Sequence, residues 1–340
     1  MPRFKSSSNS SRWVIHLVLG ICAILIVLAI WNLFPKTKLM ESNEMIMSVN
    51  DHTIYPDEFR FYVNRLLETY LPIYGEKTFS QKNLFGGFLT TASNYVVQNY
   101  VMLDWATENG FTLTDEMKST AKAQLDEYKA SFDSEESFYS RLSSSGLTED
   151  NYLQFLELNQ VLSAFDDFLY DPERSPYKIA DEDVLSLADE YGIFGAEHIF
   201  FPYGETDDEK AANKDKCENA YARLNAGENF EDLMNELSED PGLSSYPNGY
   251  TFGPDSNFDQ AFYTATQSIE IGQYTGVVTS ADGYHIIKRI NPDTNDACYL
   301  IRVAMANKEF AERQTNAKVI YSPRFGEIEF SDFSVSSDTE

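Results

Sequence analysis

Histidine is scarce in this chain, and two of its four histidines lie inside short apolar runs of the kind that form β-strands. His198 stands in the run AEHIFF and His285 in the run GYHIIK. An imidazole can exchange a proton near neutral pH or bind a metal ion, so a pair on neighbouring strands could carry chemistry. The same pair could also be a buried, mutually hydrogen-bonded element that only holds two strands together. The residues alone leave both interpretations open.

A third polar group, Asp240, follows a predicted amphipathic helix and precedes Pro241. Two imidazoles and this carboxylate could in principle bind a metal ion through three ligands. No second cluster of ligands supports that hypothesis, and the three cysteines do not have the usual spacing of a metal site or a disulfide framework. We therefore expect no metal and no other cofactor. Asp240 could also be only a turn residue at the end of a helix.

The elements that must position these groups are predicted between residues 192 and 292. A strand over 194–201 alternates in side-chain direction, so His198 shares one face with the residues two positions away. Thr206 and Asn229 are predicted to cap the two helices that follow. The remaining predicted elements are a short strand at 250–252, a helix carrying Phe258 and Phe262, a strand over 275–279, a tight turn at Asp282-Gly283 and a last strand over 284–290.

Five motifs follow one another in a consistent order over residues 194–291. They are A-x-H-I-F, L-N-A-G-E-N-F-E-D-L-M-N-E-L-S-E-D, N-G-Y-T-F, F-x-x-x-F and G-Y-H-I-I-K. With this set the segment resembles the parvulin-type peptidyl-prolyl cis-trans isomerases, and among them the membrane-anchored extracellular foldases of the PrsA and SurA type. The resemblance implies a parvulin-like antiparallel sheet flanked by helices over residues 192–292.

The resemblance also implies the catalytic residues. His198 and His285 match the family's paired histidines, which sit beneath the site on neighbouring strands. Asp240 matches a position that is cysteine or aspartate in the family, and we expect it to act electrostatically and not as a nucleophile. The histidines are expected either to take part in catalysis or to shape the site.

Substrate-binding residues are implied in the same way. Phe252, Phe258 and Phe262 match positions at the pocket that holds the proline ring. Asp282 is also assigned to substrate binding, although many members have a hydroxyl or another small residue there, which puts hydroxyl-mediated tuning of the histidines in doubt. The loop over 202–208 lacks a basic cluster, so a preference for phosphoserine before proline is not expected.

Residues 41–178 are predicted to form a mainly helical domain whose opening, V-N-D-H-T-I-Y-P-D-E-F, looks like the chaperone region of PrsA and SurA relatives. Its Tyr, Phe and Leu residues could form the domain's own core or an open cleft for unfolded chains. The resembled architecture implies that the segment 293–330 packs back on this domain, with 317–321 pairing near 46–50. One helix of this domain is predicted to begin at Pro56, and four more are predicted over 92–108, 115–132, 135–143 and 148–169. The stretch 318–330 is predicted to be rich in β-structure.

The segment 13–34 contains 22 residues without a formal charge, close to the ~20 needed to span a bilayer as a helix. The alternative, a secretory signal peptide, would have a shorter apolar core and a cleavage site. We predict a single-pass cell-membrane protein with a cytoplasmic tail over 1–12, the bilayer as a partner of 13–34, and the bulk of the chain extracellular. The last residues, 331–340, are predicted to be disordered.

Together these expectations describe an α+β protein with a transmembrane helix, a helical chaperone-like domain and an inserted parvulin-like domain. We expect a foldase that isomerises X-Pro bonds in unfolded or newly exported polypeptides. The alternative is a non-catalytic chaperone that binds such chains through a parvulin-shaped module. The formal charge of −28 argues against nucleic acid as a partner. The oligomeric state is open, and a homodimer is one option.

Overall fold

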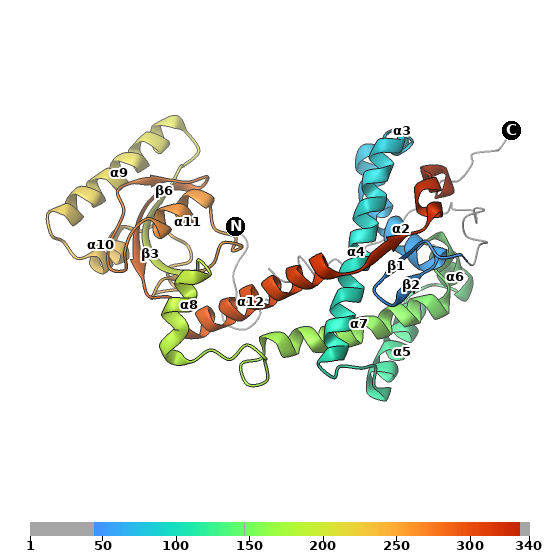
Figure 1. The fold of residues 1–340 in the computed structure, drawn as a ribbon. Coiled ribbons are helices and arrows are strands. Elements are labelled where there is room, and N and C mark those ends of the chain that lie inside the picture. The colour runs from blue at the N-terminus through green and yellow to red at the C-terminus, as the bar shows by residue number, and fades with distance from the viewer. Residues whose placement is uncertain (1–43, 146, 334–340) are drawn as a thin grey trace. The chain divides into compact units, whose positions relative to one another are not determined.

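The computed structural model describes residues 44–145 and 147–333 of the 340-residue chain. Within these ranges the chain divides into two compact units, each described here by itself (Figure 1). The helical unit comprises the described residues of 44–168 and 307–333. The sheet unit comprises residues 169–306. The chain thus leaves the helical unit, forms the whole sheet unit and then returns.

The helical unit is built mainly from α-helices that turn aromatic and aliphatic side chains inward. Its helices are α2 (Pro56–Tyr74), α3 (Glu76–Phe79), α4 (Lys82–Glu108), α5 (Asp115–Ala130), α6 (Glu135–Ser144) and α7 (Glu149–Tyr170). Helix α2 begins at Pro56, whose fixed φ suits the first helical position, and stops before Gly75, which adopts a φ of 74°. Helix α4 begins at Lys82, ten residues before the predicted start. Helices α5, α6 and α7 begin within one residue of their predicted starts, and α3 was not predicted.

A small antiparallel sheet joins the first and last described segments of the helical unit. Its strands β1 (Met47–Val49), β2 (His52–Ile54) and β7 (Val319–Tyr321) are ordered β2-β1-β7. Met47 pairs with Tyr321 and Val49 with Val319, so the returning segment pairs where the sequence predicted it. The stretch predicted as β-rich over 318–330 is a strand only at β7. It continues as the 3₁₀ helices η3 (Pro323–Glu327) and η4 (Phe330–Asp332), because proline has no N–H to donate to a ladder.

The sheet unit contains one antiparallel sheet with the strand order β4-β3-β6-β5. Its strands are β3 (Phe194–Pro202), β4 (Tyr250–Phe252), β5 (Val278–Thr279) and β6 (Gly283–Ile290). Its helices are η2 (Asp181–Asp183), α8 (Val184–Glu190), α9 (Asp207–Asn225), α10 (Phe230–Leu237), α11 (Gln260–Gln267) and the first half of α12 (Thr294–Asn316), which continues into the helical unit.

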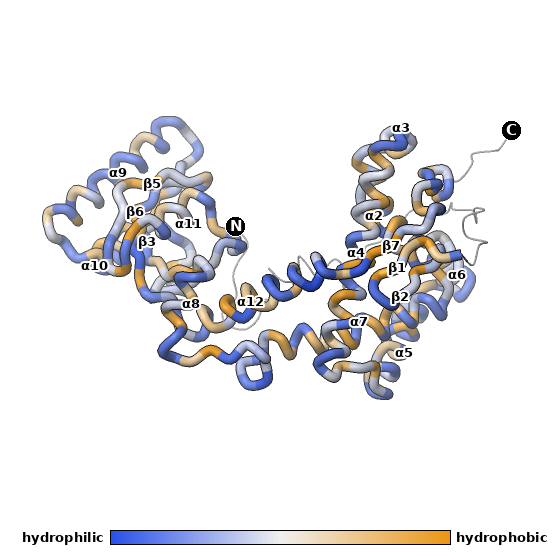
Figure 2. The backbone as a smooth tube through the Cα atoms, in the orientation of Figure 1, coloured by the Kyte–Doolittle hydropathy of each residue, from blue (hydrophilic) through white to orange (hydrophobic). Residues whose placement is uncertain are grey.

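The two faces of this sheet have different contents. On one face Ile199 and Ile286 pack with residues of α9 and α10 into an apolar core. Most residues of α9 are hydrophilic, as Figure 2 shows. On the other face Ala196 and Ile287 pack with Phe262 of α11. Because side chains alternate along a strand, both histidines lie on this second face.

The predicted location in the cell membrane is contradicted by the structure. Within residues 44–145 and 147–333, no helix is both long and apolar enough to cross a bilayer. Helix α4 has 27 residues, which would suffice in length, but polar side chains such as Asn94 and Gln98 interrupt it. The span predicted over 13–34 and the tail predicted over 1–12 lie outside the described residues. Of the predicted disordered tail, residues 331–333 are described, and Phe333 is buried against Phe85.

Candidate active site

The register of the two long strands brings the histidines together. Strands β3 and β6 are antiparallel, with Phe200 opposite His285 and His198 opposite Ile287. His198 and His285 are therefore diagonal neighbours on one face, within reach of each other. Their Nδ1 atoms are 3.1 Å apart, and their rings are nearly parallel at 14°. Both side chains are buried.

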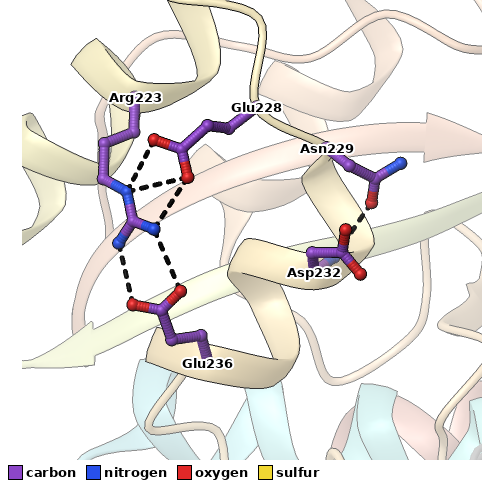
Figure 3. A network of polar contacts seen from close by, with 5 residues as sticks. All are labelled: Arg223, Glu228, Asn229, Asp232 and Glu236. Carbon is purple, nitrogen blue, oxygen red and sulfur yellow. Dashed lines mark hydrogen bonds and ion pairs between the residues drawn. The ribbon is translucent and has the colours of Figure 1, made fainter.

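The turn between α9 and α10 is held by charged side chains, and this places the end of α10 beside the sheet (Figure 3). Arg223 donates from Nη2 to Glu228 at 2.7 Å and from Nη1 to Glu236 at 2.9 Å. Asn229 caps α10 by accepting the backbone N–H of Asp232 at 2.9 Å. Helix α10 then ends at Leu237.

The residues after α10 run alongside β3 and deliver Asp240 to the histidines. Ser238 is extended, and its Oγ accepts the backbone N–H of Phe200 at 3.1 Å. The N–H of Glu239 donates to the carbonyl of Phe200 at 2.8 Å. Asp240 Oδ2 consequently lies 3.0 Å from Nε2 of His198. The sequence predicted this residue, and the geometry shows how a turn residue reaches the strand.

Asp240 is held as an anion by three donors. Besides His198, the hydroxyl of Tyr250 donates to Oδ2 at 2.6 Å, and the N–H of Gly242 donates to Oδ1 at 2.9 Å. Burial alone would raise the pKa of Asp240, but the hydrogen bonds from His198 and Tyr250 more than offset it, and the pKa falls to about 2. The carboxylate is therefore ionised at neutral pH, although its side chain is only 10% exposed.

His285 is the opposite case, a ring kept without charge. Burial, and then the proximity of His198, lowers its pKa from 6.5 to about 3. Its Nε2 lies 2.7 Å from the hydroxyl of Ser280. Ser280 was not predicted from the sequence; the only signal was a hydroxyl three residues before Gly283. The family resemblance implied that a hydroxyl that tunes the histidines would come from position 282, which is aspartate in this chain. The structure places a hydroxyl two residues earlier, at Ser280.

One proton arrangement that satisfies all these contacts starts from the ionised carboxylate. Asp240 must accept, so His198 donates from Nε2, and in this arrangement its Nδ1 accepts. His285 then donates from Nδ1 and accepts the Ser280 hydroxyl at Nε2. All four ring nitrogens are used in this chain of hydrogen bonds. Within the described ranges no group of three or more His, Cys, Asp or Glu side chains is arranged to bind a metal ion.

Aromatic rings surround the polar chain. Phe262 is edge-on to both imidazoles, with centroid distances of 5.3 Å to His198 and 5.4 Å to His285. Phe258 lies 5.4 Å from Phe262 and is half-buried, so part of its ring faces solvent. Phe200, which the sequence did not single out, stacks on His285 at 4.7 Å.

Two of the predicted site residues lie outside this cluster. Phe252 is fully buried and stacks on Phe258 at 4.5 Å, so it supports that ring from within the core. Asp282 is exposed on the turn before β6, and only its backbone contacts Ser280 and Tyr203. The structure thus brings together His198, Asp240, His285, Phe258 and Phe262, and their functional roles stay predictions.

Two family profiles match this sequence. The profile described as the PPIC-type PPIase domain matches residues 198–291, and so begins at His198 and includes both Asp240 and His285. The profile described as the SurA-like N-terminal domain matches residues 4–163.

The chain carries a parvulin-type PPIase domain. It is 25% identical to "Foldase protein PrsA" of Clostridium botulinum (strain Hall) over 183 residues, which is 51% of each chain. It is 26% identical to "Chaperone SurA" of Nitrosospira multiformis over 217 residues, 58% of this chain and 47% of the other. The chain spans about half the length of the curated relatives it matches. The exact domain boundaries proposed from the sequence stay predictions.

Solved structures of PrsA are also similar to parts of this chain. The match to the crystal structure of PrsA from Bacillus cereus covers 84% of this chain and 88% of the Bacillus cereus chain, with 21% identity and a TM-score of 0.31. The match to the crystal structure of PrsA from Bacillus subtilis covers 80% of this chain and 90% of the Bacillus subtilis chain, with 18% identity and a TM-score of 0.26. Scores at this level support no inference about this chain, so the assignment of the parvulin domain depends on the family profile and the sequence relatives.

Proposed function

We propose that the parvulin domain of this chain catalyses the cis–trans isomerisation of X-Pro peptide bonds in unfolded polypeptides. The observation that carries the proposal is the cluster in which ionised Asp240, His198 and His285 are joined by hydrogen bonds beneath the rings of Phe258 and Phe262. The matched PPIC-type profile over residues 198–291 supports the same function.

The reaction needs no bond to be broken. Resonance gives the C–N bond of an amide partial double-bond character, and the barrier to rotation is ~18–20 kcal/mol. The planar amide carries partial negative charge on its carbonyl oxygen, and the twisted state loses that charge. A fixed anion beside the oxygen, within apolar walls, destabilises the planar state more than the twisted one. Each ~1.4 kcal/mol of this difference is worth about a factor of ten in rate.

The residues divide this work between them. Phe258, whose ring is partly exposed, and Phe262 are proposed to hold the proline ring. Asp240 is proposed to supply the fixed negative charge, because its oxygens already accept three hydrogen bonds and it cannot serve as a free nucleophile. His198 and His285 hold Asp240 in place and shape the floor of the site.

Exchange NMR on a short X-Pro peptide tests this function. The rate of cis–trans exchange is measured with the native chain, with Asp240→Ala and with Phe262→Ala. We expect fast exchange with the native chain and at least a tenfold loss in each variant. Without catalysis the exchange takes tens to hundreds of seconds. Equal exchange rates with and without the native protein would refute the proposal.

A second candidate function, binding of unfolded polypeptide by the helical unit, is favoured by an exposed apolar surface. The aromatic patch is formed by Tyr70, Ile73 and Tyr74 near the end of α2 and by Leu84 of α4, which are 36–68% exposed. Tyr70 stacks on Tyr74 and lies edge-on to Phe88 of α4. Exposed apolar surface of this kind is typical of interaction sites. In this proposal residues 41–178 and 293–330 form the binding domain.

Suppression of aggregation of an unfolded test protein separates the two functions. The double variant Ile73→Ser, Tyr74→Ser should lose suppression and keep isomerase activity. Leu185→Ser is the matched control, because Leu185 is 49% exposed but belongs to α8 of the sheet unit. Equal suppression by the double variant and the control would remove the aromatic patch from this function.

A further inference from the structure

We propose that Tyr250 is a positioning residue of the site: its hydroxyl holds the Asp240 carboxylate toward His198, and residue 242 is glycine to leave room for that hydroxyl. This inference rests on the proposed function for its effect on rate. The claim that Tyr250 holds the Asp240 carboxylate does not depend on the proposed function.

The sheet register places Tyr250 where it can do this. Tyr250 is opposite Ala196 in the pairing of β4 with β3, so it lies on the same face as His198, opposite the residue two positions before it in β3. Its hydroxyl donates to Asp240 Oδ2 at 2.6 Å, which is shorter than the 3.0 Å from His198 Nε2 to the same oxygen. Short hydrogen bonds to an ionised acceptor are the strong ones.

Asp240 needs such a tether because it lies outside regular secondary structure. It follows the end of α10 and precedes the loop that leads to β4. The N–H of Gly242 donates to Oδ1, whereas His198 Nε2 of β3 and the hydroxyl of Tyr250, from the neighbouring strand β4, both contact Oδ2. The ring of Tyr250 is itself fixed by Tyr246 at 4.9 Å and by Phe258 at 5.6 Å.

Gly242 is the second half of the arrangement. A Cβ at this position would overlap the hydroxyl oxygen of Tyr250, and it would lie 3.2 Å from the ring carbon that bears the hydroxyl. An alanine at 242 is therefore incompatible with the hydroxyl in its present place. With phenylalanine at 250 two contacts of the Cβ remain, 3.2 Å to that ring carbon and 3.3 Å to Asp240 Oδ1, and each requires a shift of only a few tenths of an ångström. Gly242 and Tyr250 are thus expected to depend on each other.

The first test measures the Asp240 carboxyl directly by ¹³C NMR titration of the full chain, without substrate. The titratable groups in contact with this carboxyl are His198 and Tyr250. Tyr246 packs on the ring of Tyr250, His285 contacts His198, and Asp259 beside α11 interacts with His285. Tyr250→Phe should raise the pKa of Asp240 by at least about one pH unit, because a donor to the ionised form is lost. Tyr263→Phe is the matched control, since its hydroxyl donates to the carbonyl of Gly192 instead. An Asp240 pKa that is equal in both variants would overturn the proposal.

The second test uses the exchange rate on an X-Pro peptide. Tyr250→Phe should lower the rate about tenfold, and the acid limb of its pH profile should move to higher pH. Gly242→Ala should lower the rate similarly in the native background, but less than twofold in the Tyr250→Phe background. An equal loss in both backgrounds would contradict the coupling. If the native chain shows no exchange at all, the proposed function fails, whereas the carboxyl titration still decides the role of Tyr250.

Discussion

The buried polar groups of the site in the sheet unit differ from two buried polar residues of helix α2 in the helical unit. In the site, Asp240, His198 and His285 all have hydrogen-bond partners on neighbouring elements. In the helical unit, Arg60 and Asn64 of α2 are 3% and 2% exposed, yet both have buried nitrogen or oxygen atoms without a hydrogen-bond partner. Burial accordingly lowers the pKa of Arg60.

The two units are therefore suited to different kinds of ligand contact. A fully satisfied polar chain fixes the position of one carboxylate to within the tolerance of a hydrogen bond, as a site for a small reacting group requires. The helical unit is held by aromatic packing instead, for example Trp105 against Phe165 and Phe61 against Phe155. Its exposed rings and aliphatic side chains suit broad, sequence-tolerant contacts.

The largest expected effect on stability is at Phe262, because its ring is buried between α11 and both imidazoles. Phe262→Ala should destabilise the sheet unit by ~3–5 kcal/mol, and Phe262→Leu should recover much of that loss. Phe258→Ala, at a half-buried ring, should cost less stability but weaken peptide binding more. Urea unfolding followed by circular dichroism measures the first effect, and peptide titration the second. Equal stability losses at both positions would show that Phe258 is also only a core residue.

Acid should destabilise the sheet unit more than the helical unit. The folded pKa of His285, about 3, lies below its ordinary value of 6.5, so the unfolded chain takes up the proton first as the pH falls. The stability from the neutral ring is fully present above pH 6.5 and is lost as the pH falls toward 3. Asp240, with a pKa of about 2, adds a loss below its ordinary value of 3.8.

Between pH 7 and pH 4 we therefore expect the sheet unit to lose more than ~2 kcal/mol of stability. Hydrogen exchange of backbone amides in β3 and β6, measured across this range, tests it. His285→Gln should flatten the dependence, since glutamine does not titrate. A dependence that is unchanged in His285→Gln would assign the acid sensitivity to other groups.

Much of this fold and site could be predicted from the sequence. The N-caps Thr206 and Asn229, and the alternation along β3, are local signals, and they predicted α9, α10 and the face that carries His198. Asp240 and both histidines were predicted because the family resemblance attaches to short motifs around them. The pairing of 319–321 with 47–49 followed from the same resemblance.

The rest could not be predicted, because it depends on contacts between distant segments. Tyr250 and Ser280 are ordinary polar residues in the sequence, and only the packing of β4 on β3 and of the turn at 280 on β6 turns them into partners of Asp240 and His285. Asp282 was assigned to substrate binding because it directly precedes Gly283, but its side chain is exposed. Phe252 was assigned to the proline pocket, although its complete burial depends on Phe258 and Phe262 lying above it.

Smaller effects on stability are expected at Ser280, whose hydroxyl has a hydrogen-bond partner, and at Arg60, which has buried nitrogen atoms without one. Ser280→Ala should destabilise by ~1–2 kcal/mol, because it removes a partner of a buried ring. Arg60→Met should be neutral or stabilising by ~1 kcal/mol, because it removes buried donors that lack acceptors. Thermal unfolding of both variants measures these changes. Destabilisation by Arg60→Met as large as that by Ser280→Ala would contradict the contrast drawn above.

The smallest expected effect is at Asp282, because its carboxylate is exposed and lies outside the hydrogen-bond chain of the site. Asp282→Ala should change the exchange rate on a neutral X-Pro peptide by less than about twofold, since exposed charges contribute little. Exchange NMR with the same peptide as above measures it. A loss of tenfold or more would place Asp282 in contact with substrate, as the resemblance implied.

Asp240→Asn tests the contribution of the negative charge, because asparagine keeps the size of the side chain and removes the charge, while it also replaces one accepting oxygen by an amide nitrogen. The measurement is the ratio kcat/KM for a neutral X-Pro peptide, taken for the native chain and for the variant from pH 5 to pH 8. A fixed anion that destabilises the planar amide predicts at least a tenfold lower kcat/KM for the variant at every pH in this range. Equal values for the two proteins would contradict the electrostatic role of Asp240.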